Sequence, residues 1–529
     1  MQMMIYTLLT PAVLRTVVSG VLVLVAFLVY RRYRRWEAGF NAFPGKPISH
    51  WFFGNLKEFP GLTEEGYNFN VEMVKLFPKF FRFWVGRIYC VLIFQHPDTV
   101  KVVLKSSAPK SRAPGTLYVP GLRWLGEGLL IANGERWARN RRLLTPAFHF
   151  DILQPYTDIN NKCVDILLSK LQGFCDRGEN FEAFEHIGLC SLDIIGRCAF
   201  SYITDAQTQG DKHPYVNAVH RLTELWTKRT LNLFHILDWV YFNFTKDGRE
   251  FSKLCDYVHK VAEDIIQKRK KVLVGPACCV LKLFQEIEGL PSNDGNRKRY
   301  LDFLDILITA KDEDGVGLCD YDIRCEVDTF MFEAHDTTSS GISYTLLCLA
   351  QNQEIQEKVR QEVDDILTGR ESDDITWKDL AKFEYLNMCI KEGLRYSSPV
   401  HVVQRHTTEE LQVEGYTIPS GTNIIVHLYA LHHNPAVWGS DFNEYRPERF
   451  LHENVEKMDP FAFVPFSGGP RNCIGQNFAM MEMKIMIARI IHRFKIETVP
   501  GHIYRKELSV VTRSENGILL KITQRRRKT

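Results

Sequence analysis

Apolar residues recur at helical spacing through most of the chain, from Asp98 to about Glu371 and again from Ile474 to about Phe494. Polar or broken stretches at 204–213 and 291–299 predict loops between helices. Alternating segments typical of strands are few and short, at residues 80–85, 90–94 and 411–427, the last of them turning at 419–421. The pattern therefore predicts a mainly α protein with small β-sheets, an α+β fold.

The most uniform apolar run lies near the N-terminus, from Pro11 to Tyr30, where Arg15 is the sole charge. As a helix these ~20 residues would extend roughly 30 Å, enough to cross the hydrocarbon of a bilayer. The basic cluster from Arg31 to Trp36 follows, which predicts that this side faces the cytosol. Because a cleaved signal peptide carries its charges before the apolar run, we expect an uncleaved anchor; a buried core helix is the alternative.

A short segment from Phe43 to Pro47 carries two prolines and a glycine, so it cannot continue a helix and predicts a stiff linker. We therefore divide the chain into a membrane anchor (1–36), a linker (37–50) and one catalytic domain (51–529).

Composition narrows the class of protein. Of the 529 residues, 45% are hydrophobic, which allows a large core, and the net charge of +3 gives no reason to expect nucleic-acid binding. The 13 cysteines are scattered and odd in number, a pattern typical of a reducing compartment without a disulfide framework.

One cysteine, Cys473, stands in a glycine-rich loop just before a predicted helix. Backbone N–H groups and the positive end of the helix dipole favour a thiolate there, and Arg471 adds a nearby cation. Gly475 leaves room for a flat group to approach the backbone. A small apolar residue in the core is the ordinary alternative for any cysteine.

The pattern Phe-x-x-Gly-x-Arg-x-Cys-x-Gly is filled at every fixed position between Phe466 and Gly475. It resembles the haem-binding loop of the cytochrome P450 superfamily, the haem-thiolate monooxygenases. The resemblance implies the cytochrome P450 fold behind one transmembrane helix, with haem b (heme) as cofactor and Cys473 as the axial ligand of its iron. It also places Phe466, Arg471 and Gly475 at the cofactor.

A polar stretch interrupts an otherwise apolar helix predicted from about Tyr321 to Gln351. A solvent-facing stripe is the common explanation, but the apolar flanks favour a functional groove in a buried helix. Asp336 and Thr337 in this stretch resemble the superfamily's acid–alcohol pair, which implies proton delivery to bound oxygen.

The same stretch resembles the fourth P450 family, the fatty-acid ω-hydroxylases, whose pattern is Glu-Gly-His-Asp-Thr-Thr. Glu333 matches the glutamate that can form an ester with a haem methyl group, and Ala334 replaces the family's glycine. A non-covalent polar contact is the alternative role for Glu333.

Two further sets of residues match the superfamily. Trp137 and Arg141 are four apart, so on a helix they share a face and can donate to a carboxylate such as a haem propionate. The resemblance implies a similar role for Arg405. It also joins Glu392, Arg395 and Arg449 in a buried structural network, although the first two could form a plain surface pair.

The resemblance implies a monooxygenase that inserts one atom of O2 into a C–H bond of a small lipophilic substrate, by branch the ω-carbon of fatty acids or eicosanoids. Because no flavin- or nicotinamide-binding segment is visible, the electron donor is expected to be a separate protein, and the resemblance implies NADPH–cytochrome P450 reductase, with cytochrome b5 as a further partner. Arg471 and Lys484 are candidates for the docking face. The expected location is the endoplasmic reticulum membrane, with a single-pass anchor and a cytosolic catalytic domain.

Three alternatives remain: oxidation of xenobiotics or other lipids by the same chemistry, a reductase-independent haem-thiolate isomerase, and a haem-binding sensor or carrier. The acid–alcohol pair argues against the last two. The sequon at Asn243 should stay unglycosylated if the catalytic domain is cytosolic.

Overall fold

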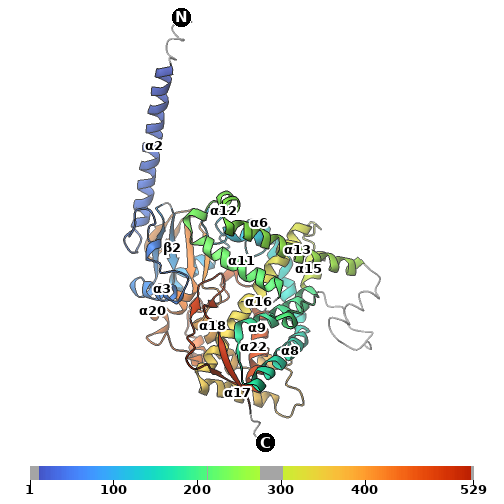
Figure 1. Ribbon diagram of the computed structural model, residues 1–529. Coiled ribbons are helices and arrows are strands. Elements are labelled where there is room, and N and C mark those ends of the chain that lie inside the picture. The colour runs from blue at the N-terminus through green and yellow to red at the C-terminus, as the bar shows by residue number, and fades with distance from the viewer. Residues whose placement is uncertain (1–10, 88, 211–212, 275–301, 526–529) are drawn as a thin grey trace.

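The computed structural model describes residues 11–87, 89–210, 213–274 and 302–525. The loop predicted at 291–299 lies outside these residues. In the described part of the chain helices dominate and there are four small sheets, so the predicted α+β fold is confirmed (Figure 1).

The helical body is built around α16 (Asp320–Gln351), which packs against α9 (Ala183–Phe200), α18 (Tyr385–Tyr396) and α22 (Gln476–Arg493). Most of the side chains of α16 are buried on every face, as expected of a helix that runs through a core. The other helices are α3 (Glu64–Leu76), α4 (Pro97–Leu104), α5 (Leu122–Leu125), α6 (Gly134–Leu144), α7 (Phe150–Leu153), α8 (Tyr156–Arg177), α10 (Ala206–Gln209), α11 (Pro214–Thr230), α12 (Asp238–Phe244), α13 (Lys246–Val274), α15 (Phe303–Thr309), α17 (Gln353–Leu367), α19 (Leu428–His432), α20 (Pro435–Trp438) and α21 (His452–Val455).

The largest sheet has four strands in the order β1 (Phe80–Val85), β2 (Tyr89–Phe94), β7 (Asn423–His427), β4 (Val402–His406). Strands β2 and β7 are parallel, and the other two pairs are antiparallel. The smaller sheets are β3 (Asn180–Glu182), β11 (Leu519–Gln524) and β8 (Phe494–Thr498); β5 (Leu411–Val413) with β6 (Tyr416–Ile418); and β9 (Lys506–Glu507) with β10 (Arg513–Ser514).

The segment 411–427 turns where predicted, between β6 and β7, but these two strands do not pair with each other. Strand β6 closes a hairpin with β5, while β7 enters the middle of the four-stranded sheet. Because pairing depends on distant strands, the local alternation predicted the turn but not the partners.

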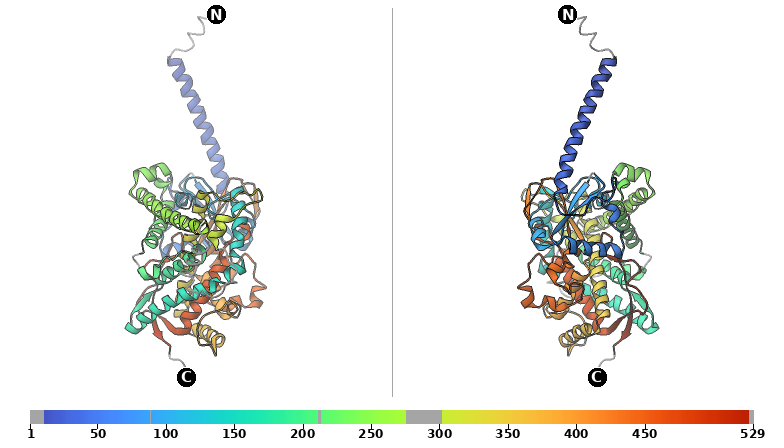
Figure 2. Two further views of the ribbon diagram at one scale, coloured as in Figure 1. Left: turned by 90° about the vertical axis from the view of Figure 1, so that its right-hand side faces the viewer. Right: turned by 90° about the vertical axis from the view of Figure 1, so that its left-hand side faces the viewer.

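The N-terminal helix α2 (Pro11–Asn41) stands away from the body (Figure 2), and none of its 18-residue apolar window is buried. It is long and apolar enough to cross a membrane. The helix ends at Asn41, later than the predicted anchor boundary at 36, because Trp36 and Phe40 share a face and both pack against Trp84. The first residues of the predicted linker are therefore helical, and they seat the helix on β1.

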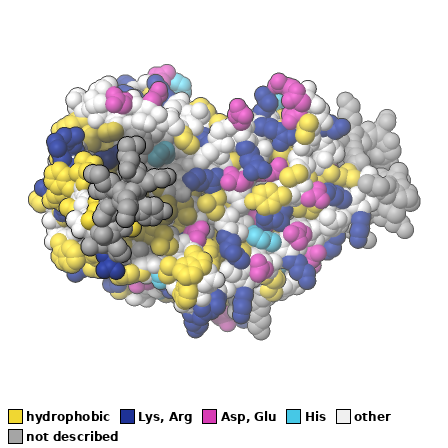
Figure 3. Space-filling view, turned by 90° about the horizontal axis from the view of Figure 1, so that it is seen from above, with side chains coloured by type: hydrophobic (Ala, Val, Ile, Leu, Met, Phe, Trp, Pro, Cys, Tyr) yellow, Lys and Arg dark blue, Asp and Glu magenta, His cyan; other side chains and the backbone are white. Residues whose placement is uncertain are grey.

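Large exposed apolar side chains gather around the foot of α2, as the view along that helix shows (Figure 3). They include Trp51 and Phe52 before β1 and Phe234, Leu237 and Trp239 before and within α12. The rings of Phe52 and Phe234 lie 6.4 Å apart, which joins the two groups. This side of the molecule therefore has the character of a surface for an apolar phase.

Candidate functional site

A cavity of about 460 Å³ lies inside the body and brings most of the predicted site residues together. Its walls come from α16, α6, the four-stranded sheet and the loop before α22, and most of its surface is apolar. The predicted residues that line it are Trp137, Arg141, Glu333, Thr337, Arg405, Phe466, Arg471, Cys473 and Gly475. Asp336 and the Glu392 network lie outside its wall.

The loop from Phe466 to Gly475 holds Cys473 at the cavity wall. The N–H of Cys473 donates to the carbonyl of Phe466 at 2.9 Å, which closes the loop on itself. Gly469 has a φ of +68°, and a Cβ there would lie 1.9 Å from the carbonyl oxygen of Leu104, so only glycine fits. A Cβ added at Gly475 would meet nothing closer than 3.8 Å, which leaves open space beside the Cys473 sulfur.

Burial opposes the thiolate that the helix end and Arg471 were predicted to favour at Cys473. The side chain is accessible only because it faces the cavity, and burial raises the pKa of its thiol to about 11. The nearby carboxyl of Glu333 raises this pKa further, and the Gly475 N–H and Arg141 oppose both effects too weakly to reverse them. Coordination to a metal, which deprotonates a thiol outright, is therefore what would make this sulfur anionic.

Arg141 and Arg471 connect helix α6 to the cysteine loop. Arg141 donates to the backbone oxygen and the side-chain oxygen of Asn472, both at 2.8 Å, directly before Cys473. The guanidinium of Arg471 lies 4.4 Å from the centre of the Trp137 ring and donates to the carbonyl of Ala132 at 2.9 Å. Trp137 and Arg141, which were predicted to share one face of a helix, thus both contact residues of the cysteine loop.

Lys110 and Arg405 complete a group of cations on this wall, which together with Arg471 we call the cationic cluster. Arg405 is buried, and Lys110 lies over the Tyr118 ring at 4.2 Å and donates to the carbonyl of Leu130. Burial and the two neighbouring guanidinium groups hold the pKa of Lys110 well below its ordinary value. Sequence reasoning missed Lys110, because a single lysine in an irregular segment carries no periodic or motif signal.

The docking role predicted for Arg471 and Lys484 is not supported. Arg471 is buried against Trp137, and the ammonium of Lys484 donates to the carbonyl of Leu380 at 2.8 Å. Neither cation is free on the surface to meet a reductase.

Helix α16 presents Glu333 and Thr337 to the cavity, one turn apart. Burial raises the pKa of Glu333 to about 7, although the Lys110 cation counteracts it. The hydroxyl of Thr337 donates to the carbonyl of Glu333 at 2.8 Å, a bond that holds the side chain along the helix. The predicted polar groove in a buried helix is therefore present.

Asp336, by contrast, points away from the cavity. Both of its carboxylate oxygens accept hydrogen bonds from Arg513 of β10, at 2.7 and 2.9 Å. The guanidinium of Arg513 also lies 5.3 Å from the Phe184 ring centre. The acid of the predicted acid–alcohol pair is thus held in an ion pair, and its predicted role in proton delivery stays a prediction.

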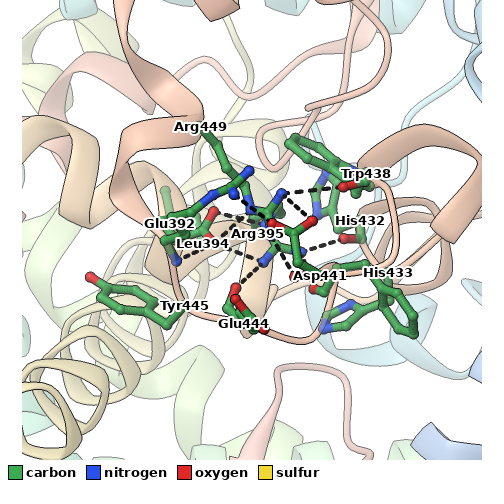
Figure 4. A network of polar contacts seen from close by, with 12 residues as sticks. Glu392, Leu394, Arg395, His432, His433, Trp438, Asp441, Glu444, Tyr445 and Arg449 are labelled. Carbon is green, nitrogen blue, oxygen red and sulfur yellow. Dashed lines mark hydrogen bonds and ion pairs between the residues drawn. The ribbon is translucent and has the colours of Figure 1, made fainter.

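Glu392, Arg395 and Arg449 meet in a buried network (Figure 4). Glu392 and Arg395 form a two-pronged ion pair with both distances at 2.8 Å, and neither side chain is exposed. Arg449 lies 3.4 Å from Glu392 and also pairs with Asp441.

The network also ties several loops to α18. Arg395 donates to the backbone carbonyls of His432, Phe442 and Glu444, and the N–H of Arg446 donates to Glu392. Since every buried charge has a partner of opposite sign or a carbonyl, the network is structural, and the surface-pair alternative is excluded by its burial.

The cavity fits a flat, dianionic, iron-containing group such as haem. Its charged lining residues, among those that the structure describes, are the cations Lys110, Arg141, Arg405 and Arg471 and the acid Glu333, so a ligand with two carboxylates would offset most of their net positive charge. The Nε atoms of Arg405 and Arg471 are enclosed without a hydrogen-bond partner among the described residues, so the cationic side of the cavity has unsatisfied donors. The Cys473 sulfur faces the same space.

A helical body with a cysteine loop, a cationic cluster and a polar groove around one apolar cavity defines a haem-thiolate enzyme. The chain belongs to the cytochrome P450 family, whose sequence profile matches residues 44–521. It is 41% identical to human (Homo sapiens) cytochrome P450 4F2 over 488 residues, 91% of this chain and 90% of that protein. The human ultra-long-chain fatty acid omega-hydroxylase is 39% identical over 91% of this chain and 88% of its own.

A third relative, leukotriene-B4 omega-hydroxylase 3 of Mus musculus, is 38% identical over 95% of this chain and 93% of its own. The protein is therefore a P450 monooxygenase with haem iron as its cofactor. Enzymes of this family use O2, a lipophilic substrate and electrons from a redox partner, and the apolar helix α2 is a candidate membrane anchor.

Proposed function

We propose that this enzyme hydroxylates the terminal carbon of fatty-acid or eicosanoid chains. The observation that carries the proposal is that Glu333, Thr337 and Cys473 border one largely apolar cavity of about 460 Å³. Two of the relatives named above are omega-hydroxylases, of ultra-long-chain fatty acids and of leukotriene B4. A terminal methyl has stronger C–H bonds than its neighbours, so a selective enzyme must hold the chain end-on.

Residues of the cavity wall would bind the cofactor. Cys473 would supply the thiolate ligand, and the cationic cluster, with Arg141 and the indole N–H of Trp137, would receive the propionates. Phe466 and Gly475 would border the flat face beside the sulfur. When bound, thiolate-ligated haem supplies the iron at which O2 is activated and its O–O bond cleaved.

Helix α16 would serve the oxygen side of the site. The Thr337 hydroxyl, which lines the cavity and donates to the Glu333 carbonyl, would turn to hold a water and pass a proton into the cavity, with Asp336 as the acid. Because Arg513 binds both oxygens of Asp336, that carboxylate must exchange partners before it can relay a proton. Glu333 would form an ester with a haem methyl group, in which a methyl C–H bond is replaced by a C–O bond and the two electrons released would reduce the oxidant that the enzyme makes from O2. The ester would immobilise the cofactor and favour attack on the chain end.

The surface around α2 supports membrane access for the substrate. The exposed apolar side chains before β1 and near α12 lie on the side from which α2 projects (Figure 3). A second hollow of about 420 Å³ shares Leu56, Leu62 and Leu231 with the wall of the main cavity and reaches Phe234. A lipid could therefore pass from the bilayer to the cavity without crossing water.

We further propose that α2 anchors the protein in the endoplasmic reticulum membrane. The body, which includes the linker and the catalytic domain predicted from residue 37 onward, would lie in the cytosol. NADPH–cytochrome P450 reductase would be the electron donor and cytochrome b5 a second one. Basic residues directly after the apolar run, such as Arg31 and Arg32, support this orientation.

The test uses the full chain in lipid vesicles with reductase and NADPH, and a panel of saturated and oxygenated fatty acids. We expect a terminal hydroxy acid as the main product, formed only with NADPH and reductase. The proposal is contradicted if Cys473→Ala retains haem and gives the same products. It is also contradicted if the parent protein gives in-chain products alone, or converts a peroxide substrate without reductase.

A further inference from the structure

Two histidines, His401 and His427, line the cavity and have no part in the proposed reaction. His427 is the last residue of β7 and pairs across the sheet with Val402, the first residue of β4. His401 directly precedes β4, and its backbone oxygen accepts a hydrogen bond from the N–H of Tyr429 at 3.2 Å. The two ring centres lie 6.4 Å apart, so the register of the sheet places one imidazole beside the other.

The hydrogen bonds of both rings are incomplete. Nδ1 of His427 accepts from the N–H of Ala430 at 3.2 Å, but its Nε2 has no partner among the described residues. Nδ1 of His401 is enclosed by protein without a partner, and its Nε2 has none in the described part of the chain either. Neither Nε2 atom is enclosed by protein, in contrast to Nδ1 of His401. Because both rings line the cavity, we infer that both Nε2 atoms face it. Buried polar groups rarely stay unpaired, so a ligand group belongs there.

The two rings are uncharged at neutral pH, which selects the kind of ligand. Burial lowers the pKa of His401 to about 4 and that of His427 to about 3. In neutral His427 the proton must lie on Nε2, because Nδ1 is an acceptor, so this ring donates into the cavity. His401 can accept at Nε2. A hydroxyl group, which both accepts and donates, satisfies the pair, whereas a carboxylate gains no charge partner.

The surroundings of the pair suit the hydrocarbon part of a substrate. The neighbouring wall is apolar and includes Val400, Val402, Leu428, Leu508 and Val511. Arg405 of the cationic cluster lies in β4, four residues after His401, which is about 13 Å away at ordinary strand spacing. The pair is therefore a separate polar point in an apolar wall and does not belong to the cationic cluster.

We propose that His401 and His427 form a subsite for a hydroxyl group carried along a fatty-acid chain, so that hydroxylated fatty acids bind better than unsubstituted acids of equal length. This inference rests on the proposed function, because it names the class of lipid that the same cavity prefers. Two neutral hydrogen bonds made in place of none account for a preference of about tenfold in Kd.

The test titrates the haem-loaded full chain with hexadecanoic acid and with a positional series of its hydroxy derivatives, using the haem absorbance shift and tryptophan quenching as independent measures of Kd. We expect at least one isomer to bind about tenfold more tightly than the parent acid. His427→Asn should abolish that preference, because Asn keeps an acceptor for the Ala430 N–H but lacks the Nε2 donor.

Two variants separate hydrogen bonding from ring shape. His401→Leu should also abolish the preference, while His401→Gln, whose amide reaches the Nε2 position, should retain most of it. His452→Leu on α21 is the control, because His452 is 88% exposed and lies outside the cavity wall, and it should behave as the parent protein does.

The proposal is wrong if no isomer binds more tightly than hexadecanoic acid, or if the preference survives both His427→Asn and His401→Leu. It is also wrong if these variants weaken all chains equally, since the pair would then bind the carboxyl end that they share. Product analysis of the same samples is read separately: absence of terminal hydroxylation refutes the proposed function and leaves the binding preference measurable.

Discussion

Replacing Glu392 by alanine should destabilise the protein more than almost any other single loss of charge in the molecule. Glu392 is fully buried and neutralises Arg395, with two bonds of 2.8 Å, and it lies 3.4 Å from Arg449. Its removal leaves one guanidinium without its acid and the N–H of Arg446 without its acceptor. Breaking a buried pair costs about 3–5 kcal/mol, and an orphaned N–H adds about 1–3 kcal/mol.

A loss of this size is a large part of the whole stability of a protein, which is about 5–15 kcal/mol. The chain offers a matched control in Glu72 and Lys75 on α3, which have the same sequence separation and the same 2.8 Å distance. Their side chains are 65% and 48% exposed, so Glu72→Ala should cost less than about 1 kcal/mol.

The assay follows loss of the haem absorbance band and of tryptophan fluorescence with urea, for the detergent-solubilised parent and both variants. We expect Glu392→Ala to lower the midpoint strongly and to be purified with little haem, while Glu72→Ala overlays the parent. Because the network is structural, the Glu392→Ala fraction that retains haem should give the same products. Equal midpoints for the two variants would show that the buried pair contributes no more than a surface pair, and would refute the reasoning.

Three further changes test other parts of the structure. Glu333→Ala should make the haem extractable with acidified solvent and raise the share of in-chain products; free extraction from the parent protein would exclude the ester. Glu482 keeps its proton to a pKa of about 8 when folded, because it is buried beside Ser191, but loses it near 4.5 when unfolded, so the folded state binds more protons between these values. The free energy of unfolding should therefore fall as pH rises from 4.5 to 8, by a few kcal/mol in order of magnitude. Urea titrations at each pH should show a weaker pH dependence for Glu482→Gln. An unchanged pH dependence would show that other groups cause it. In Gly393→Ala the new Cβ would lie 2.3 Å from the Thr345 hydroxyl, so the free energy of unfolding should fall by about 1–3 kcal/mol. Gly39→Ala is the control, because open space surrounds that position, and it should be neutral or slightly stabilising. Equal melting temperatures for the two variants would contradict this prediction.

Local patterns predicted the elements that carry their own signal. The spacing of apolar residues predicted the long buried helix α16 and the strand β1 with its bounds, and the run from Pro11 to Tyr30 predicted the exposed helix α2. The cysteine loop was recognised because its glycines, arginine and cysteine match a known haem-binding motif, and Gly469 occupies a position that only glycine fits. Such features depend on residues that are close together in the chain, so they can be predicted from the sequence alone.

Features that depend on distant segments were not predicted. The pairing of Asp336 with Arg513 joins α16 to a two-residue strand near the C-terminus, and no spacing in the sequence relates them. Lys110 reaches the cationic cluster from an irregular segment, and its burial there follows from the folded body. The helix end beside Cys473 acts locally and could be predicted, whereas the burial that raises the pKa of its thiol comes from the whole cavity wall.

The same distinction separates the chemistry of this enzyme from its selectivity. Oxygen activation needs a few groups at fixed places, and each of them, from the cysteine loop to the polar turn of α16, is set by a short motif. The choice of substrate depends on a wall assembled from segments between Leu56 and Val511, whose side chains meet only through tertiary packing. His401 and His427 illustrate this, because they become neighbours through the β4–β7 register and not through their positions in the chain. Within this one family, changes at such positions can therefore alter which lipid is bound while the reaction itself stays the same.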